Sequence, residues 1–438
     1  MKIAVIGAGI SGLGAAFALS KTHDVRVFER DGRIGGHAHT VDVDFEDGPQ
    51  WVDTGFIVYN HRNYPNLTAL VEELAVPTRW SDMSFGFSLH NGACEYACDN
   101  ISKIFAQRWR ALDPRFVQTF TEIIRFTRVA PRDLKSGRMA GQSLSAWLDD
   151  RRFSRWFRER FLLPMGGAIW STSVNDVLEF PAESFVRFFV NHDLMTGLDP
   201  AQRWRTVDGG SREYVKRLVA SIGPRVIVDR AAVSVDQSGP TPVVTFADGS
   251  HERFDHVILA CHGPTARGLL NDPTEDQHTI LSAFRTSSNH VVLHSDPALM
   301  PQRRQVWSSW NFLSDGIEAD AGRPAQVSYW MNRLQGIRED RPLFVSLNPQ
   351  RDTDPALTHR TFSYDHPLYD RASFDAQHAI DRIQGLGGVW YAGAWLGYGF
   401  HEDGLRSGLR VAEALGARPG WVQDTGTPLV RPLVHAAE

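Results

Sequence analysis

The feature that most constrains this chain is a glycine-rich turn between an apolar strand and a helix. The strand is predicted from Lys2 to Ile6, and the pattern Gly7-x-Gly9-x-x-Gly12 follows it directly. After the glycines, apolar residues recur at helical spacing, at Leu13, Ala16, Phe17 and Leu19. This order of strand, glycine turn and helix is typical of a βαβ unit that binds a dinucleotide, so the sequence predicts an α/β fold with a parallel sheet.

Each glycine of the turn has a physical task. Gly7 permits the tight turn, Gly9 lets the backbone approach a pyrophosphate, and Gly12 lets the helix lie close to the strand. The first N–H groups of the helix, at Ile10 and Ser11, offer hydrogen bonds and a positive dipole end to the pyrophosphate. We therefore expect a dinucleotide here; the competing interpretation is an ordinary turn without a ligand.

A second predicted strand, Val25 to Phe28, ends at Glu29, which lies 22 residues after Gly7. A carboxylate at this distance accepts hydrogen bonds from a ribose 2′-OH and repels a 2′-phosphate. Strand, helix, second strand and acid all fall in register, which favours a dinucleotide other than NADP.

Length and composition set further bounds. A chain of 438 residues is too long for one core and suggests two interleaved domains. The net charge of −5 gives no general basic field, so we expect no nucleic-acid partner.

The cysteines Cys94, Cys98 and Cys261 give no disulfide framework. Cys94 and Cys98 have the spacing of a redox pair or half a metal site, but no second Cys/His cluster accompanies them, which favours reduced thiols and no metal. The first strand starts at once, leaving no room for a signal peptide, and no run of 18 apolar residues occurs. We expect a cytoplasmic protein.

Two further stretches carry a resemblance. Arg33-Ile34-Gly35-Gly36-His37 follows the acid, and a last strand, Val389 to Gly393, is followed by AWLGYGFHEDGLRSGLRVAEAL. With these motifs the chain resembles the flavin amine oxidase and phytoene desaturase superfamily, whose members open with an acid at the second strand and then R-x-G-G. Within it, the chain is similar to a bacterial NAD/FAD-binding subgroup related to proteins that act on unsaturated fatty acyl chains. The resemblance covers the first hundred residues, about 163–260, and 389–415.

The resemblance implies a Rossmann-like FAD-binding domain with an interleaved α+β substrate-binding domain, the architecture of glutathione reductase-like flavoproteins. We expect the FAD-binding domain in residues 1–80, 204–264 and 374–420. The substrate domain is expected in 81–203 and 265–373, and 421–438 as a C-terminal tail.

The resemblance also implies FAD as the cofactor and places its contacts in three parts of the chain. These are Gly7, Gly9, Ile10, Ser11, Gly12, Glu29, Arg30, Arg33, Gly35, Gly36, His37, Thr54, Gly55, Phe56, Val233, Gly393, Ala394, His401, Glu402 and Gly404. The chain departs from the family pattern twice: His37 replaces an arginine, and Ala394 replaces the acid that holds the ribityl chain.

By resemblance, the preferred function is an FAD-dependent dehydrogenase or desaturase that accepts a hydride from an apolar substrate, an unsaturated fatty acyl chain. The alternatives are a flavin amine oxidase, a double-bond isomerase that returns the hydride, and a flavoprotein that only binds a partner. A flavin carries the difficult step, so no catalytic dyad is required. The catalytic side chains are not identified, and the candidates are Tyr398, His401, Trp395 and Tyr59.

The middle of the chain is rich in aromatic residues. Nine occur in the 37 residues from Phe153 to Phe189, and Phe185, Phe188, Phe189 and His192 form one helical stripe. The local excess favours a domain that encloses an apolar small molecule or acyl lipid.

Upstream, Lys103 to Arg138 holds nine basic residues against three acids, with aromatic residues between them. The favoured interpretation is a solvated helix face with its aromatic side in the core; the alternative is a face that rests on an anionic membrane. The sequence does not indicate an oligomeric state.

Overall fold

The structure is a computed structural model that describes residues 1–192, 203–316 and 322–423. A five-stranded parallel sheet has the strand order β10-β2-β1-β14-β21. Its strands are β1 (Lys2–Ile6), β2 (Asp24–Phe28), β10 (Val226–Ile227), β14 (His256–Leu259) and β21 (Val389–Tyr391). The predicted α/β fold with a Rossmann-like parallel sheet is therefore confirmed.

Both faces of the parallel sheet are covered. Alternate side chains of β1 point to opposite faces, so Ile3 and Val5 join one apolar cluster while Ala4 and Ile6 join another. The first cluster lies beneath three helices, α1 (Ile10–Leu19), α10 (Arg212–Ile222) and α16 (His401–Ala414).

The second cluster lies beneath a four-stranded sheet and two helices. These elements are β11 (Ala232–Asp236), β12 (Val243–Phe246), β13 (His251–Arg253), β15 (Leu270–Asn271), α11 (Gly263–Leu269) and α12 (Glu275–Ser282).

A seven-stranded mixed sheet has the order β20-β16-β19-β18-β17-β7-β8. Its strands are β7 (Phe85–Leu89), β8 (Cys94–Ala97), β16 (Arg285–His294), β17 (Trp310–Leu313), β18 (Gln326–Trp330), β19 (Phe344–Leu347) and β20 (Thr358–Leu368). These strands come from two stretches of the chain that alternate with strands of the parallel sheet. The strand predicted at His290 to His294 is longer, because all of Arg285–His294 pairs with β20.

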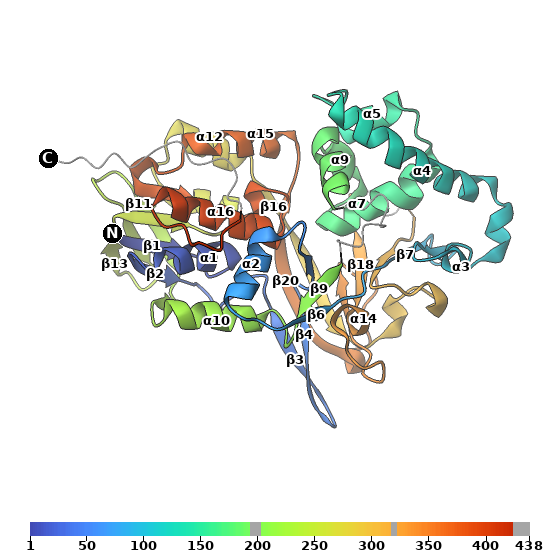
Figure 1. Ribbon diagram of the computed structural model, residues 1–438, viewed down its shortest axis with the longest axis horizontal. Helices are drawn as coiled ribbons and strands as arrows, with labels where there is room; N and C mark the ends of the chain where they lie inside the picture. The colour runs from blue at the N-terminus through green and yellow to red at the C-terminus, as the bar shows by residue number, and fades with distance from the viewer. Residues whose placement is uncertain (193–202, 317–321, 424–438) are drawn as a thin grey trace.

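A group of helices packs beside this sheet at the end of the molecule away from the parallel sheet (Figure 1). The helices are α3 (Ile101–Ile104), α4 (Pro114–Lys135), α5 (Leu144–Asp150), α6 (Arg155–Phe157), α7 (Leu163–Trp170), α8 (Val174–Glu179) and α9 (Ala182–Asn191). Their shared core is aromatic and includes the predicted stripe residues Phe185, Phe188 and Phe189, which are buried. His192 caps the end of α9.

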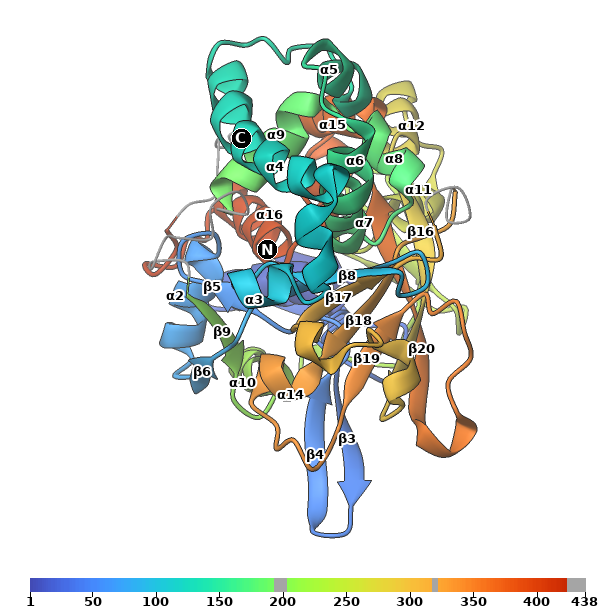
Figure 2. The same cartoon turned by 90° about the vertical axis from the view of Figure 1, so that its right-hand side faces the viewer.

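Smaller elements join the parallel sheet and the seven-stranded mixed sheet. The hairpin of β3 (Thr40–Phe45) and β4 (Gly48–Asp53) projects from the body in both views (Figures 1 and 2). A three-stranded sheet holds β5 (Tyr59–Asn60), β9 (Trp204–Val207) and β6 (Thr78–Trp80). The described residues also form the α-helices α2 (Pro65–Glu73), α14 (Met331–Gln335) and α15 (Arg371–Ala379), and several short 3-10 helices.

The start of the predicted tail is packed against the body. Val422 is buried, and the ring of Trp421 lies 6.1 Å from the ring of Phe17 on α1. Residues 424–438 lie outside the described residues.

Candidate functional site

The first glycine turn brings two strands and a helix into close contact. Gly7 has a φ of +108°, and its N–H donates to the carbonyl of Phe28, 2.9 Å away. A Cβ at Gly7 would lie 2.6 Å from the Ala260 carbonyl oxygen, and a Cβ at Gly12 would lie 2.0 Å from the Gly7 carbonyl oxygen. Only glycine fits at either position, as the sequence pattern predicts.

Gly9 differs from its two neighbours. It has a φ of −80°, it precedes α1 without a side-chain cap, and a Cβ built on it would meet nothing within 4 Å. The space beside Gly9 is therefore open, next to the first N–H groups of α1, at Ile10 and Ser11. This geometry fits a pyrophosphate, because those N–H groups lack intrahelical partners.

The second glycine pair lies against this opening. The Gly35 N–H donates to the Ala8 carbonyl at 2.9 Å, and a Cβ on Gly36 would lie 3.1 Å from the Gly9 Cα. The Arg33 guanidinium donates to the carbonyls of Gly36 at 2.8 Å and Ala38 at 3.3 Å. Arg33 therefore holds the loop that borders the predicted phosphate site.

The predicted ribose and adenine contacts lie at the ends of neighbouring strands. Glu29 accepts hydrogen bonds from the N–H groups of Ala8 at 2.9 Å and Asp31 at 3.2 Å, so its carboxylate faces the glycine turn. Arg30 is exposed. The ladder of β11 and β12 shifts register between Ala232 and Ser234, so Val233 is the extra residue of a bulge. A bulge leaves its backbone groups out of the ladder, which suits the predicted adenine contact.

The two ends of the chain meet where α16 crosses α1. A Cβ on Gly404 would lie 2.9 Å from the Ser11 Oγ, and one on Gly408 would lie 2.1 Å from the Ser11 carbonyl oxygen. The start of α16 therefore lies next to the start of α1. Figure 1 shows the two helices side by side, although they are nearly 400 residues apart in the sequence.

His401 opens α16 and is buried against aromatic rings. Its ring stacks on Phe56, with centroids 3.8 Å apart, and its Nε2 lies 2.7 Å from the Tyr214 hydroxyl oxygen. Burial lowers the pKa of His401 to about 3. The imidazole is therefore neutral near neutral pH, and a group with so low a pKa is a weak general base.

The two acids after His401 serve the backbone. Glu402 accepts hydrogen bonds from the N–H groups of Asn66 at 3.0 Å and Leu67 at 2.9 Å, and from the Asn66 amide at 2.7 Å. Asp403 accepts from the N–H groups of Tyr398 at 3.0 Å and Phe400 at 3.1 Å. Glu402 thus fixes α16 to the start of α2, and burial raises its pKa to about 7.

Histidines gather beside the second glycine pair. The His37 ring centroid lies 6.0 Å from His262, 5.5 Å from His366 and 5.3 Å from Tyr364. Burial is the main cause that lowers the pKa of His37, and it lowers the pKa of His366 to about 4, so both are neutral near pH 7. Among the described residues, the buried His37 Nε2 has no hydrogen-bond partner. An unpaired buried nitrogen at the predicted phosphate-contact position fits a bound acceptor oxygen.

The turn predicted to lie against the flavin ring packs on this histidine group. Phe56 donates its N–H to the His37 carbonyl at 2.8 Å, and a Cβ on Gly55 would lie 2.2 Å from that same oxygen. The Thr54 hydroxyl lies 2.8 Å from the Tyr364 hydroxyl. This turn therefore joins His37 to His401.

A buried carboxylate supports this turn. Asp53 accepts hydrogen bonds from the hydroxyls of Thr40 at 2.6 Å and Ser211 at 2.7 Å, and from the Gln335 amide at 2.7 Å. Burial raises the pKa of Asp53 to about 6. Because Asp53 directly precedes Thr54, the network positions the turn.

The other catalytic candidates lie in different surroundings. Trp395 donates to the Cys261 carbonyl at 2.9 Å and packs 4.3 Å from Phe284, in the core behind the parallel sheet. The ring of Tyr59 packs on Tyr64 and His61. These contacts are those of structural residues.

Tyr398 belongs to an aromatic wall over the start of α16. Its ring lies 5.6 Å from Phe188, which stacks 5.1 Å from Phe400 and 3.9 Å from His192. The Trp170 indole donates to the Tyr398 carbonyl at 3.2 Å. We call Trp170, Phe188, His192, Tyr398 and Phe400 the aromatic wall. It connects the helical group of α7 and α9 to α16.

In the last of the three parts of the chain with predicted FAD contacts, the Gly393 N–H donates to the Ser407 hydroxyl at 2.9 Å. The next residue is Ala394, which has no carboxylate. The open Gly9, the unpaired His37 nitrogen and the bulged Val233 nevertheless fit FAD. The acid that family members use for the ribityl chain is absent from position 394.

Sequence reasoning missed Tyr214, His262, Tyr364 and His366. His262 follows the parallel strand β14, and the carboxyl end of such a strand is where ligands bind, so it had a usable signal. The other three come from distant helices and strands, and nothing in their local sequence marks them.

Two observations on the described residues concern membrane spans and metal sites. No helix in these ranges is both long and apolar enough to cross a bilayer. No cluster of three or more His, Cys, Asp or Glu suited to a metal ion was found among them.

The profile of a family described as flavin containing amine oxidoreductase matches residues 10–351. AofH of Mycobacterium tuberculosis, which is named as a flavin-containing monoamine oxidase, is 24% identical over 371 residues, covering 81% of this chain and 72% of that protein.

Solved structures share the fold at low sequence identity. The CLA-producing fatty acid isomerase from P. acnes superposes with a TM-score of 0.67 at 13% identity, covering 95% of this chain and 98% of that one. Putrescine oxidase bound to putrescine gives a TM-score of 0.65 at 16% identity, covering 95% and 99%. Cyclohexylamine oxidase from Brevibacterium oxydans gives 0.65 at 17%, also covering 95% and 99%. These likenesses concern the fold.

Proposed function

The chain belongs to the flavin-containing amine oxidoreductase family and is an FAD-dependent oxidoreductase, and we propose that its substrate is an apolar molecule, an unsaturated fatty acyl chain. FAD supplies a hydride acceptor at its N5 atom when bound. The protein contributes position, exclusion of water and local charge.

The observation that carries the proposal is the set of aromatic side chains that gather around the start of α16. His401 and Phe56 stack there, and the aromatic wall covers the adjoining turn. Burial keeps His401 neutral, while Glu402 and Asp403 are occupied by backbone N–H groups. A carbon chain fits such a surface, whereas an ammonium group would lose its hydration without gaining a carboxylate partner.

The start of α16 also supports the redox role. Its first N–H groups and the positive end of its dipole favour negative charge at this point. The resemblance places the pyrimidine end of the flavin here, so the helix would stabilise the reduced, anionic cofactor.

Isomerisation of a double bond is the second candidate. Dehydrogenation of a carbon chain releases a hydride and a proton, and the proton needs a base. His401 has a pKa of about 3 and is a weak base. The pKa of Glu402 is raised to about 7, but its carboxylate accepts three hydrogen bonds from Asn66 and Leu67 and is engaged in holding α2. A reaction that removes and returns one hydride needs no such base. The fold likeness to a fatty acid isomerase supports this candidate.

The domain division and the location are part of the proposal. Residues 81–203 and 265–373 would form the substrate domain, a division supported by the aromatic wall residues that α7 and α9 supply. Free thiols at Cys94, Cys98 and Cys261 support a location in the cytoplasm.

The test is product analysis. The holoenzyme is incubated with unsaturated acyl lipids and an artificial electron acceptor, and the lipids are analysed by mass spectrometry. Loss of two hydrogens supports dehydrogenation, and an unchanged mass with a moved double bond supports isomerisation. Unchanged lipids, together with aldehyde and ammonia from added amines, would reject both in favour of amine oxidation.

A further inference from the structure

A surface segment away from the cofactor site carries exposed apolar and basic side chains together. It consists of α3, the short helix Arg108–Leu112 and α4, and we call it the α3–α4 surface. The segment lies at the right-hand end of the molecule in Figure 1 and in front of it in Figure 2. It therefore forms the end opposite the parallel sheet.

Exposed apolar side chains concentrate on this surface. Of the eight large apolar side chains that are exposed in the described ranges, five lie here: Ile101, Trp109, Leu112, Val117 and Ile124. Leu112 is 87% exposed, Ile101 76% and Trp109 60%. Single exposed apolar residues are ordinary, but a group of them marks an interaction site.

The charge on the same surface has one sign. Seven basic residues between Ile101 and Arg138 are exposed: Arg108, Arg115, Arg125, Arg128, Arg132, Lys135 and Arg138. The three acids of this stretch are not exposed, and each is engaged. Asp113 caps α4 at Arg115, Glu122 accepts from the Ser154 N–H at 3.1 Å, and Asp133 accepts from the Trp147 indole at 2.9 Å. The surface is thus positive on a chain whose net charge is −5.

The two classes of side chain share one face of α4. The outward stripe follows helical spacing and contains Val117, Thr121, Ile124, Arg128, Arg132 and Lys135, all exposed. The opposite stripe is buried and contains Phe116, Thr119, Phe126, Ala130 and Asp133. Val117 and Ile124, with Thr121 between them, occupy the half of the outward stripe nearest Leu112, and basic residues occupy the other half.

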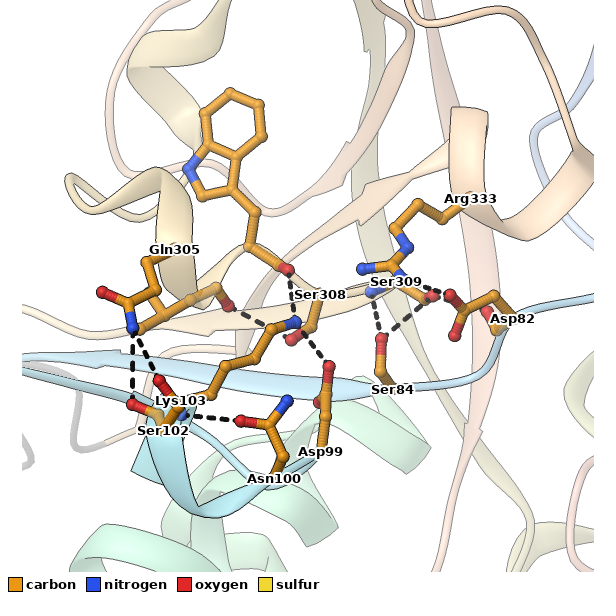
Figure 3. A network of polar contacts seen from close by, with 12 residues as sticks. Asp82, Ser84, Asp99, Asn100, Ser102, Lys103, Gln305, Ser308, Ser309 and Arg333 are labelled. Atoms are coloured by element: carbon orange, nitrogen blue, oxygen red, sulfur yellow. Dashed lines mark hydrogen bonds and ion pairs between the residues drawn. The ribbon is translucent and has the colours of Figure 1, made fainter. Parts of the chain in front are cut away.

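The segment is fixed to the protein body. Figure 3 shows Lys103 beside Asp99 and Gln305 beside Ser102. Lys103 donates to Asp99 at 2.5 Å and to the Trp307 carbonyl at 3.4 Å, and the Gln305 amide donates to the Ser102 hydroxyl at 3.3 Å. These contacts fix α3 to the protein body, and Ile101 remains exposed on α3. Arg110 is buried, and its guanidinium lies 4.3 Å from the Trp109 ring centroid.

We propose that the α3–α4 surface docks on an anionic lipid bilayer. Ile101, Trp109 and Leu112 would enter the interface between headgroups and acyl chains, while the arginines and Lys135 would contact the lipid phosphates. A nucleic acid or an acidic protein surface would use the charges but not an almost fully exposed leucine. The proposal concerns binding alone and does not depend on the substrate.

Co-sedimentation of the holoenzyme with vesicles tests it. We expect binding to phosphatidylcholine vesicles that contain phosphatidylglycerol, weak binding to phosphatidylcholine alone, and release by high salt. The apolar variant W109S/L112S and the charge variant R108Q/R128Q should both bind less. The charge variant should lose roughly fivefold in partitioning for each arginine removed.

Matched controls lie elsewhere on the surface. Trp80 is 58% exposed on β6, so W80S controls for the loss of an exposed tryptophan. R371Q/R382Q removes two exposed arginines on α15 and the turn after it. Both should bind like the wild type. Failure of the wild type to sediment with anionic vesicles would overturn the proposal. So would an apolar variant that binds like the wild type, because that result would show that Trp109 and Leu112 do not enter the lipid interface.

Discussion

The ring of His401 lies face to face on the ring of Phe56, with centroids 3.8 Å apart and planes within 9°. Phe56 ends the turn after β4, near the start of the chain, and His401 opens α16, the last of the described helices. The contact therefore joins the two distant segments for which the resemblance predicts flavin contacts. Two further groups support the pair: the Tyr214 hydroxyl lies 2.7 Å from the His401 Nε2, and Asp53, which accepts a hydrogen bond from the Ser211 hydroxyl, supports the turn that carries Phe56.

Substitution of His401 tests whether its side chain is a base. Since burial lowers its pKa to about 3, we expect H401Q to retain kcat within about tenfold, and the pH profile of the wild type to lack an ionisation near 6.5. Steady-state kinetics across pH would check this. A loss of about 10² to 10⁴ in kcat, with the profile altered, would instead identify His401 as a general base.

Two glycines of the first turn should respond differently to alanine. A Cβ on Gly9 meets no protein atom within 4 Å, whereas a Cβ on Gly12 would lie 2.0 Å from the Gly7 carbonyl oxygen. We expect G9A to lose FAD but to fold with the melting temperature of the wild-type apoprotein, and G12A to fold poorly. Flavin absorbance per protein and thermal unfolding measure the two effects. Full flavin content in G9A would place the pyrophosphate elsewhere.

Glu402 should matter for stability through α2. E402A leaves the N–H groups of Asn66 and Leu67 without their acceptor in a buried site, which costs about 2 to 4 kcal/mol. The matched control is E73A, because Glu73 lies on the exposed side of α2. This variant should change the free energy of unfolding by less than about 0.5 kcal/mol. Chemical denaturation gives both values; equal effects would contradict the anchoring role.

The lowered pKa of His366 predicts that the protein loses stability in acid. Burial lowers the pKa of His366 from 6.5 to about 4, so between these values the unfolded chain binds a proton that the folded chain does not. Stability therefore falls as the pH drops from 6.5 to 4, by up to about 3 kcal/mol for this residue. The melting temperature of H366N should show a smaller decline over this window. If the melting temperature of H366N falls with pH in parallel with that of the wild type, protonation of His366 does not cause the loss of stability.

The glycine turn, the acid at Glu29 and the β3–β4 hairpin could be predicted from the sequence because their signals are local. A positive φ at Gly7 and an alternating pattern with a turn are properties of short segments. The superfamily, the fold class and the FAD cofactor are confirmed. The individual cofactor contacts, including Arg30, Val233 and Ala394, remain predictions.

The histidine group and the support of His401 could not be predicted, because their members meet only in three dimensions. His37, His262 and His366 come from a loop, the end of a parallel strand and the mixed sheet. Trp395 illustrates the opposite case: its position after the last strand suggested the flavin, but its ring packs on Phe284 in the core. The position of Trp395 in the sequence predicted where its backbone lies but not the direction in which its side chain points.

The most direct test of the account is anaerobic titration of the purified, flavin-loaded protein, followed by its visible spectrum. We predict that unsaturated acyl lipids change or bleach the flavin absorbance and that amines leave it unchanged. Bleaching by amines, with no response to acyl lipids, would contradict the assignment of an apolar substrate.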